Sequence, residues 1–210
     1  MNDLLAHLLW PTSCAVCGFL GEDLCDPCFS RLERNLRLDH STLPNGVPAM
    51  AGAPHEGISK DLILLVKYGG RAALGFRLGQ ILAARIPSFS DACVIPAPLH
   101  KGSRRYYNQA TWIAAGLARK WSAPVIDGLC WTTRHPRQTS VSLWERRNLP
   151  RGACSWVGPD LGGRTCVVVD DVRTTGTTLL RVSEAIQEAG GNVVLAVTWT
   201  ASRLMFEKEN

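Results

Sequence analysis

A run of valines that ends in two aspartates and a threonine-rich loop constrains this chain more than any other segment. Residues 167–180 read VVVDDVRTTGTTLL. The valines predict a buried strand, and Thr177 is predicted to begin the following helix. We expect Asp170 and Asp171 to lie where the strand emerges and residues 172–176 to turn. Polar residues in this order are typical of ligand sites at the carboxyl ends of parallel strands.

Segments with strand and helix patterns alternate through most of the chain, which predicts an α/β fold with a mainly parallel sheet flanked by helices. A small N-terminal module is expected in residues 1–40, with the main domain in 41–210. Residues 39–57 are interpreted as a polar join, and KYGGR at 67–71 as a helix stop and restart. The predicted strands are 91–99, 123–133, 153–158, 164–172 and 192–201, and the predicted helices are 58–68, 72–85, 106–121 and 177–191.

The residues after the valine strand suit a ligand with two kinds of polar group. Threonine hydroxyls and the N–H groups of a helix start favour a phosphate monoester. Adjacent carboxylates repel phosphate, but they accept hydrogen bonds from a vicinal diol. Phosphate and diol together describe a ribose 5-phosphate. The alternative is an acidic turn with a hydroxyl cap on the helix, whereas a nucleoside triphosphate P-loop is disfavoured because the chain has no Gly-Lys dipeptide.

Four of the eight cysteines lie within fifteen residues, in the segment CAVCGFLGEDLCDPC. Two C-x-x-C pairs provide four thiolates for tetrahedral Zn²⁺, and an all-cysteine set indicates a closed structural site. A redox-active or iron–sulfur site is the alternative. The expected ligands are Cys14, Cys17, Cys25 and Cys28.

The sequence VVVDDVRTTGTT resembles the signature with which type I phosphoribosyltransferases bind phosphoribosyl pyrophosphate (PRPP). Nearly the whole chain is similar to the ComF family, in which an N-terminal cysteine module precedes such a domain. The segments that carry this resemblance occur in order: CAVC…LCDPC, VKYGGRAALG, VIPAPLHKGSRRYYNQA, RQTSVSLWERRNL and the aspartate–threonine motif.

The resemblance implies a type I phosphoribosyltransferase fold and a transferase that binds PRPP with Mg²⁺. A nitrogen nucleophile would then displace pyrophosphate from C1 of the ribose. Asp170 and Asp171 would be the catalytic pair that binds the ribose hydroxyls. The 5-phosphate would bind to Thr174, Thr175, Gly176, Thr177 and Thr178, and the pyrophosphate to Lys101, Arg104 and Arg105.

A segment rich in arginine, RHPRQTSVSLWERRNLPR, fits neither the helix nor the strand period. The resemblance places it near a lid that closes over PRPP. A groove for single-stranded nucleic acid and an exposed connector are the other two interpretations. The candidate residues for either functional role are Arg134, Arg137, Trp144, Arg146 and Arg147.

The resemblance to ComF also implies a role in natural competence, either in DNA uptake or in DNA utilisation. The alternative function is a non-catalytic accessory protein that binds single-stranded DNA and only senses PRPP. Its expected partners are DNA and other competence proteins. Of the 23 cationic residues, 18 are arginines, which favours recognition of phosphate or carboxylate groups.

The N-terminal segment MNDLLAHLLWPTSC has no basic stretch before its short apolar run, so we expect a helix packed on the body instead of a signal peptide. No stretch is long enough to cross a bilayer. We therefore expect a cytoplasmic protein without membrane insertion.

Overall fold

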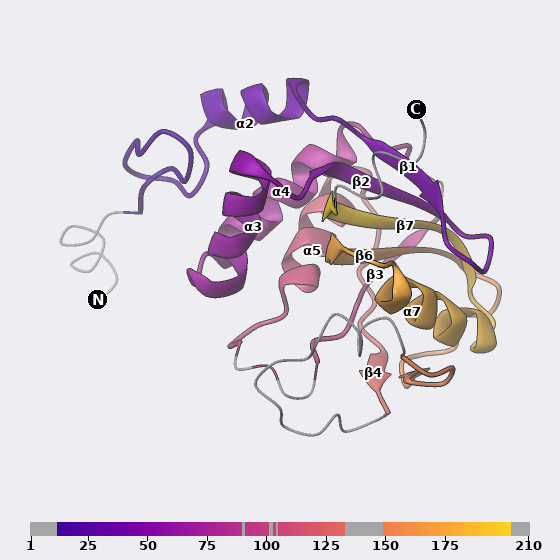
Figure 1. The fold of residues 1–210 in the computed structure, drawn as a ribbon. Coiled ribbons are helices and arrows are strands. Elements are labelled where there is room, and N and C mark those ends of the chain that lie inside the picture. The colour runs from indigo at the N-terminus through magenta and orange to yellow at the C-terminus, as the bar shows by residue number, and fades with distance from the viewer. Residues whose placement is uncertain (1–11, 90, 101–102, 104, 133–148, 203–210) are drawn as a thin grey trace, which may run out of the picture.

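The computed structural model describes residues 12–89, 91–100, 103, 105–132 and 149–202. Its main sheet has five strands in the order β1-β2-β7-β6-β3 (Figure 1). The pairs β2–β7, β7–β6 and β6–β3 are parallel, and only the edge strand β1 runs antiparallel to its neighbour. The strands are β1 (Asp39–Thr42), β2 (Pro48–Pro54), β3 (Cys93–Pro96), β6 (Thr165–Arg173) and β7 (Asn192–Ala201).

Helices cover both faces of this sheet (Figure 1). Apolar side chains of α3 (Gly57–Tyr68), α4 (Ala72–Ala83) and α5 (Gln109–Trp121) pack in one core cluster, and those of α7 (Thr177–Glu188) pack in a second. The central strands contribute alternate residues to the two clusters, as the period of a strand requires. The predicted α/β architecture with a mainly parallel sheet is confirmed.

Two glycines let α4 and α5 pack closely against each other. A Cβ atom on Gly79 would lie 2.0 Å from the carbonyl oxygen of Ile113, and one on Gly116 would lie 1.9 Å from that of Phe76. Because glycine has no Cβ atom, the two helix backbones can approach each other closely at these positions.

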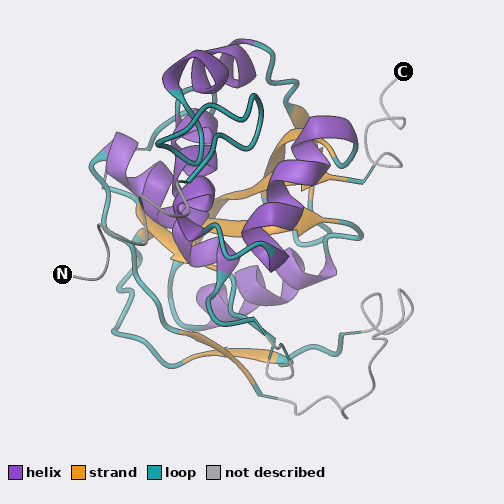
Figure 2. Ribbon diagram, turned by 90° about the vertical axis from the view of Figure 1, so that its left-hand side faces the viewer, coloured by secondary structure: helices purple, strands orange, loops and turns teal. Residues whose placement is uncertain are grey.

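A second, two-stranded sheet lies apart from the main one (Figure 2). It pairs β4 (Leu129–Trp131) with β5 (Cys154–Trp156) in antiparallel fashion. Trp131 is buried, donates from its indole N–H to the carbonyl of Pro98 at 2.9 Å, and stacks on His100. These contacts attach the small sheet to the segment that follows β3.

Two expectations about the chain path were wrong. Residues 39–57 were expected to be a polar join, but they form the hairpin β1–β2 and then enter α3 at Gly57. The residues between the two strands include the turn dipeptide Asn45–Gly46, and Gly46 has a φ of +83°. The second correction concerns β6, which continues through Arg173, whereas a turn was expected from residue 172.

The N-terminal module is joined to the main domain by shared core packing. Its helix α2 (Asp26–Arg34) begins directly after Cys25 and contains Cys28, and Leu24, Cys25 and Cys28 belong to the same core cluster as α4. β1 begins at Asp39, so this strand lies on both sides of the expected boundary between residues 40 and 41. The helix expected before residue 11 lies outside the described residues.

Candidate functional site

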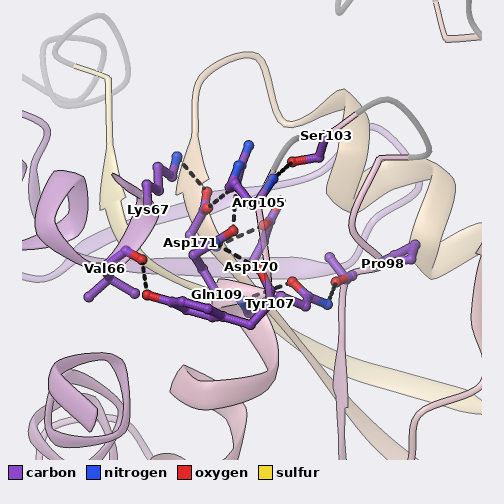
Figure 3. A network of polar contacts seen from close by, with 12 residues as sticks. Val66, Lys67, Pro98, Ser103, Arg105, Tyr107, Gln109, Asp170 and Asp171 are labelled. Carbon is purple, nitrogen blue, oxygen red and sulfur yellow. Dashed lines mark hydrogen bonds and ion pairs between the residues drawn. The ribbon is translucent and has the colours of Figure 1, made fainter. Parts of the chain in front are cut away.

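The two neighbouring aspartates lie near the carboxyl end of β6, where charged residues from two other segments meet them (Figure 3). The backbone N–H of Asp171 donates to Oδ1 of Asp170 at 2.8 Å. Nζ of Lys67 lies 2.9 Å from Oδ1 of Asp171, and Nη1 of Arg105 lies 3.6 Å from its Oδ2. Two cations therefore face the carboxylate of Asp171, next to Asp170 in the same strand.

The pKa of Asp170 is raised to about 7, first by burial and then by the neighbouring charge of Asp171. Lys67 and Arg105 act in the opposite direction and lower this pKa, but they do not offset burial. A carboxyl group with this pKa changes its charge near neutral pH, which is a property of many functional sites.

The threonine loop after β6 connects this strand to the start of α7. Gly176 is the residue before the helix, and its φ of +78° is a backbone conformation that suits glycine. The hydroxyls of Thr175 and Thr177 lie 2.9 Å apart and are half-buried. The N–H groups of a helix start and these hydroxyls can donate hydrogen bonds to an anion.

Arg105 lies between β3 and α5, and its side chain contacts residues of α5 and α3. Nη1 of Arg105 donates to Oε1 of Gln109 at 2.5 Å, and the Arg105 guanidinium lies over the ring of Tyr68, 5.9 Å from its centre. Asn108 caps α5 by accepting from the N–H of Ala110, and its amide donates to the carbonyl of Ala97. The cap fixes where α5 begins, so the segment returns to the sheet directly beside the aspartates.

The four cysteines of the N-terminal module converge on one point. Their sulfur atoms all lie within 4.8 Å of one another, and those of Cys17 and Cys25 are 3.6 Å apart. Tetrahedral Zn²⁺ with Zn–S bonds of about 2.3 Å would separate its sulfurs by roughly 3.8 Å. The arrangement therefore fits a single metal ion held by Cys14, Cys17, Cys25 and Cys28.

The surroundings of this cluster shift the pKa values of its thiols in different directions. Burial alone would raise the pKa of Cys14, but hydrogen bonds from the backbone around Cys25, Cys17 and Val16 lower that pKa to about 6. Burial raises the pKa of Cys28 to about 12. Backbone donors thus already favour a thiolate at Cys14, the form that binds metal.

The sequence matches the phosphoribosyl transferase domain family over residues 74–209, which is more than half of the chain. The chain belongs to this family. The matched region includes β3, β6 and α7, and therefore both the segment of Arg105 and the aspartate–threonine motif. The predicted fold class of a phosphoribosyltransferase with an N-terminal four-cysteine module is confirmed.

Curated relatives include an orotate phosphoribosyltransferase of Rhodopseudomonas palustris (strain TIE-1), which is 36% identical over 83 residues, or 36% of this chain and 42% of that protein. Competence protein F of Haemophilus influenzae is 31% identical over 102 residues, or 46% of this chain and 44% of that protein. The chain thus spans less than half the length of these relatives. An adenine phosphoribosyltransferase structure from Thermoanaerobacter pseudethanolicus is 15% identical, with a TM-score of 0.43 and coverage of 86% and 94% of the two chains.

These findings confirm the resemblance to ComF-like phosphoribosyltransferases. Several candidate residues of this phosphoribosyltransferase domain lie outside the described residues. They are Lys101 and Arg104 of the expected pyrophosphate loop, and Arg134, Arg137, Trp144, Arg146 and Arg147 of the arginine-rich segment. In the part of the chain that the structure describes, no helix is long and apolar enough to span a membrane.

Sequence reasoning missed Lys67. The expected helix stop and restart at KYGGR is correct, because α3 ends at Tyr68 and α4 begins at Ala72. The same five residues also supply two long-range contacts. Lys67 pairs with Asp171, while Arg71 donates to the carbonyl of Ser13 at 2.7 Å in the cysteine module. The available signal was that Lys67 lies in VKYGGRAALG, one of the segments that carry the family resemblance.

A separate groove of about 970 Å³ lies where β3 and β6 begin, at the edge of the sheet opposite the aspartates. Ala92, Arg164 and Thr165 are among its lining residues. It shares no residue with the aspartate–threonine site.

Proposed function

We propose that this phosphoribosyltransferase domain binds PRPP with Mg²⁺ at the end of β6. The observation that carries the proposal is the order of donors and acceptors along one short segment: two aspartates, then a threonine loop at a helix start. Asp170 and Asp171 accept hydrogen bonds from the ribose hydroxyls. Residues 174–178 bind the 5-phosphate, since they combine hydroxyls with the N–H groups of α7.

The reaction that such a site supports is transfer of the phosphoribosyl group. The bond between C1 and the pyrophosphate oxygen breaks, pyrophosphate leaves with the electron pair, and a nitrogen nucleophile forms the new bond to C1. Negative charge grows on the leaving group, so Arg105, with Lys101 and Arg104 as further candidates, stabilises it electrostatically. The aspartates hold the ring while C1 becomes more positive.

Mg²⁺ binds mainly to substrate oxygens and water in sites of this kind, so a dedicated set of protein ligands is not required. The carboxylates of Asp170 and Asp171 are oxygen donors of the type that Mg²⁺ accepts. When bound, the ion would neutralise charge on the diphosphate. We further propose that the four-cysteine cluster holds a structural Zn²⁺ in a small module that precedes the ligand-binding domain.

Isothermal titration of PRPP with Mg²⁺ tests this proposal. Wild-type protein is expected to bind, and Asp171→Asn is expected to weaken binding by about ten- to hundredfold, because one charge-assisted hydrogen bond contributes roughly 1.5–3 kcal/mol. Glu188→Gln is the matched control, since it also converts a carboxylate to an amide but lies at the far end of α7. No binding by wild type, or equal binding by Asp171→Asn, would refute the proposed site.

The relative named competence protein F favours a second function in natural competence. We propose that this second function is the binding of single-stranded DNA. Arg146 and Arg147 would contact the DNA backbone, with Trp144 stacked on a base. Fluorescence polarisation with labelled single-stranded DNA should show an affinity that falls as salt rises, because counterions are released on binding. The double variant Arg146→Ala/Arg147→Ala should bind more weakly, and an absence of binding at low salt would exclude this function.

A further inference from the structure

Lys67 occupies a defined place beside the two aspartates (Figure 3). It lies in the last turn of α3, and its side chain is only 15% exposed. The hydroxyl of Tyr107 donates to the carbonyl of Val66, which ties this turn of α3 to the segment that carries Arg105. The ammonium group is therefore held at the site by the packing of two segments and is not a freely moving surface charge.

Charge balance shows what this ammonium group can do when a ligand arrives. In the free protein, Lys67 and Arg105 face Asp171, and both lower the pKa of Asp170. A ribose diol is neutral, so its binding to the aspartates adds no charge. A lysine ammonium has three N–H donors, and the contact with Oδ1 of Asp171 uses one of them. The remaining donors can bind an anionic part of the same ligand.

The chemistry of the sugar indicates which anionic group this is. The 5-phosphate is proposed to bind at residues 174–178, in the loop that follows the aspartates in the chain. The hydroxyl on C2 is the neighbour of C1, which carries the diphosphate in PRPP. A cation 2.9 Å from the carboxylate that binds these hydroxyls is therefore close to the substituent on C1.

We propose that Lys67 is a specificity-determining residue that binds the diphosphate on C1 and so makes the site prefer a sugar diphosphate to a sugar monophosphate. This inference rests on the proposed function, because it assumes that the ribose binds at Asp171. It assigns a ligand contact to a helix that precedes the family match at residue 74.

A purely structural role for Lys67 leads to a different expectation. If Lys67 only orients Asp171, its removal disturbs the contact with the ribose hydroxyls, which PRPP and ribose 5-phosphate have in common. Both ligands would then lose affinity by the same factor. If Lys67 binds the diphosphate, the loss falls on PRPP, because ribose 5-phosphate has no phosphate on C1.

The test compares PRPP and ribose 5-phosphate, both with Mg²⁺, by isothermal titration on the full chain. Lys67→Met removes the charge and keeps most of the side-chain volume, and Lys67→Gln repeats the test with a polar end. Lys67→Arg keeps the charge. Lys60→Met is the matched control, because Lys60 is exposed on the same helix and its loss changes the net charge equally. Thermal unfolding of each variant verifies that it is folded.

We expect Lys67→Met and Lys67→Gln to weaken PRPP binding by about ten- to hundredfold and ribose 5-phosphate binding by less than about threefold. Lys67→Arg and Lys60→Met should keep the preference of wild type. An equal loss for both ligands, or no loss for PRPP, overturns the role of Lys67 while wild-type binding still supports the proposed function. If folded wild-type protein binds neither ligand, the proposed function itself fails.

Discussion

Arg173 donates hydrogen bonds from its guanidinium to the carboxylate of Asp39 and the hydroxyl of Ser41 inside the protein. Arg173 is the last residue of β6, and Asp39 is the first residue of the edge strand β1. Both side chains are at most 3% exposed. The pair therefore connects β6, the strand that carries the aspartates, to the edge strand β1.

Loss of this buried pair should destabilise the fold. Arg173→Met leaves the Asp39 carboxylate buried without its cation, so the free energy of unfolding should fall by about 3–5 kcal/mol in urea denaturation. Arg151→Met is the control, because the ion pair of Arg151 with Glu188 is exposed and should contribute less than about 1 kcal/mol. Similar unfolding curves for the two variants would contradict the structural role of Arg173.

The close contact between α4 and α5 gives a second prediction. Gly116→Ala should lower the free energy of unfolding by about 2–3 kcal/mol, because its Cβ would overlap the carbonyl of Phe76 and force the helices apart. Gly75→Ala is the matched control on α4. Its Cβ would lie 3.2 Å from side-chain atoms of Trp112 and Val66, and alanine also favours a helix by about 1 kcal/mol. If thermal and urea unfolding showed equal effects for Gly116→Ala and Gly75→Ala, the described packing would be contradicted.

The raised pKa of Asp170 predicts how stability depends on pH. The pKa of Asp170 is about 7 in the folded state, compared with an ordinary value of 3.8. The stability that this group contributes is therefore fully present below about pH 4 and is lost as pH rises to about 7. Asp170→Asn removes this loss. The variant should therefore exceed wild type in stability by about 1–3 kcal/mol at pH 8, and by less at pH 5.

The measurement for Asp170 is urea denaturation at both pH values, with exposed Asp61→Asn on α3 as the control. The difference between Asp170→Asn and wild type should grow between pH 5 and pH 8, whereas that of Asp61→Asn should stay nearly constant. A difference that shrinks with rising pH would show that the pKa of Asp170 is not raised.

The cysteine cluster predicts one bound metal ion per chain. Elemental analysis of purified protein should find about one zinc, and Cys28→Ser should lose most of it, because four sulfurs form the closed site. Since Cys25 and Cys28 belong to the core cluster that includes α4, removal of the metal by a chelator should also lower the thermal midpoint. Cys130→Ser is the control, because Cys130 lies in β4. A zinc content near zero would refute the structural metal site.

Local order in the sequence predicts one half of the candidate site. Asp170 to Thr178 are consecutive, so strand, loop and helix patterns were enough to place them together. The two CxxC pairs are likewise close in sequence, and their sulfurs meet. In each case the chemistry and the spacing belong to one short segment, which is the condition under which periodicity and motif reasoning are most informative.

Contacts between distant segments were not predictable in the same way. Lys67 meets Asp171 across 104 positions, and Arg173 meets Asp39 across 134. Strand β2 reads PAMAGAP, which lacks the β-branched residues typical of strands, yet it pairs with β7 over its length. Small residues suit this position because Gly52 packs against Leu82 and the backbone of Trp199. Tertiary packing thus overrides local propensity here.

A crystal structure of the protein with PRPP and Mg²⁺ would show directly whether PRPP binds at the carboxyl end of β6. We expect the 5-phosphate at residues 174–178 and the ribose hydroxyls within hydrogen-bond distance of Asp170 and Asp171. PRPP bound elsewhere, for example in the groove beside Arg164 where β3 and β6 begin, would contradict the proposed site.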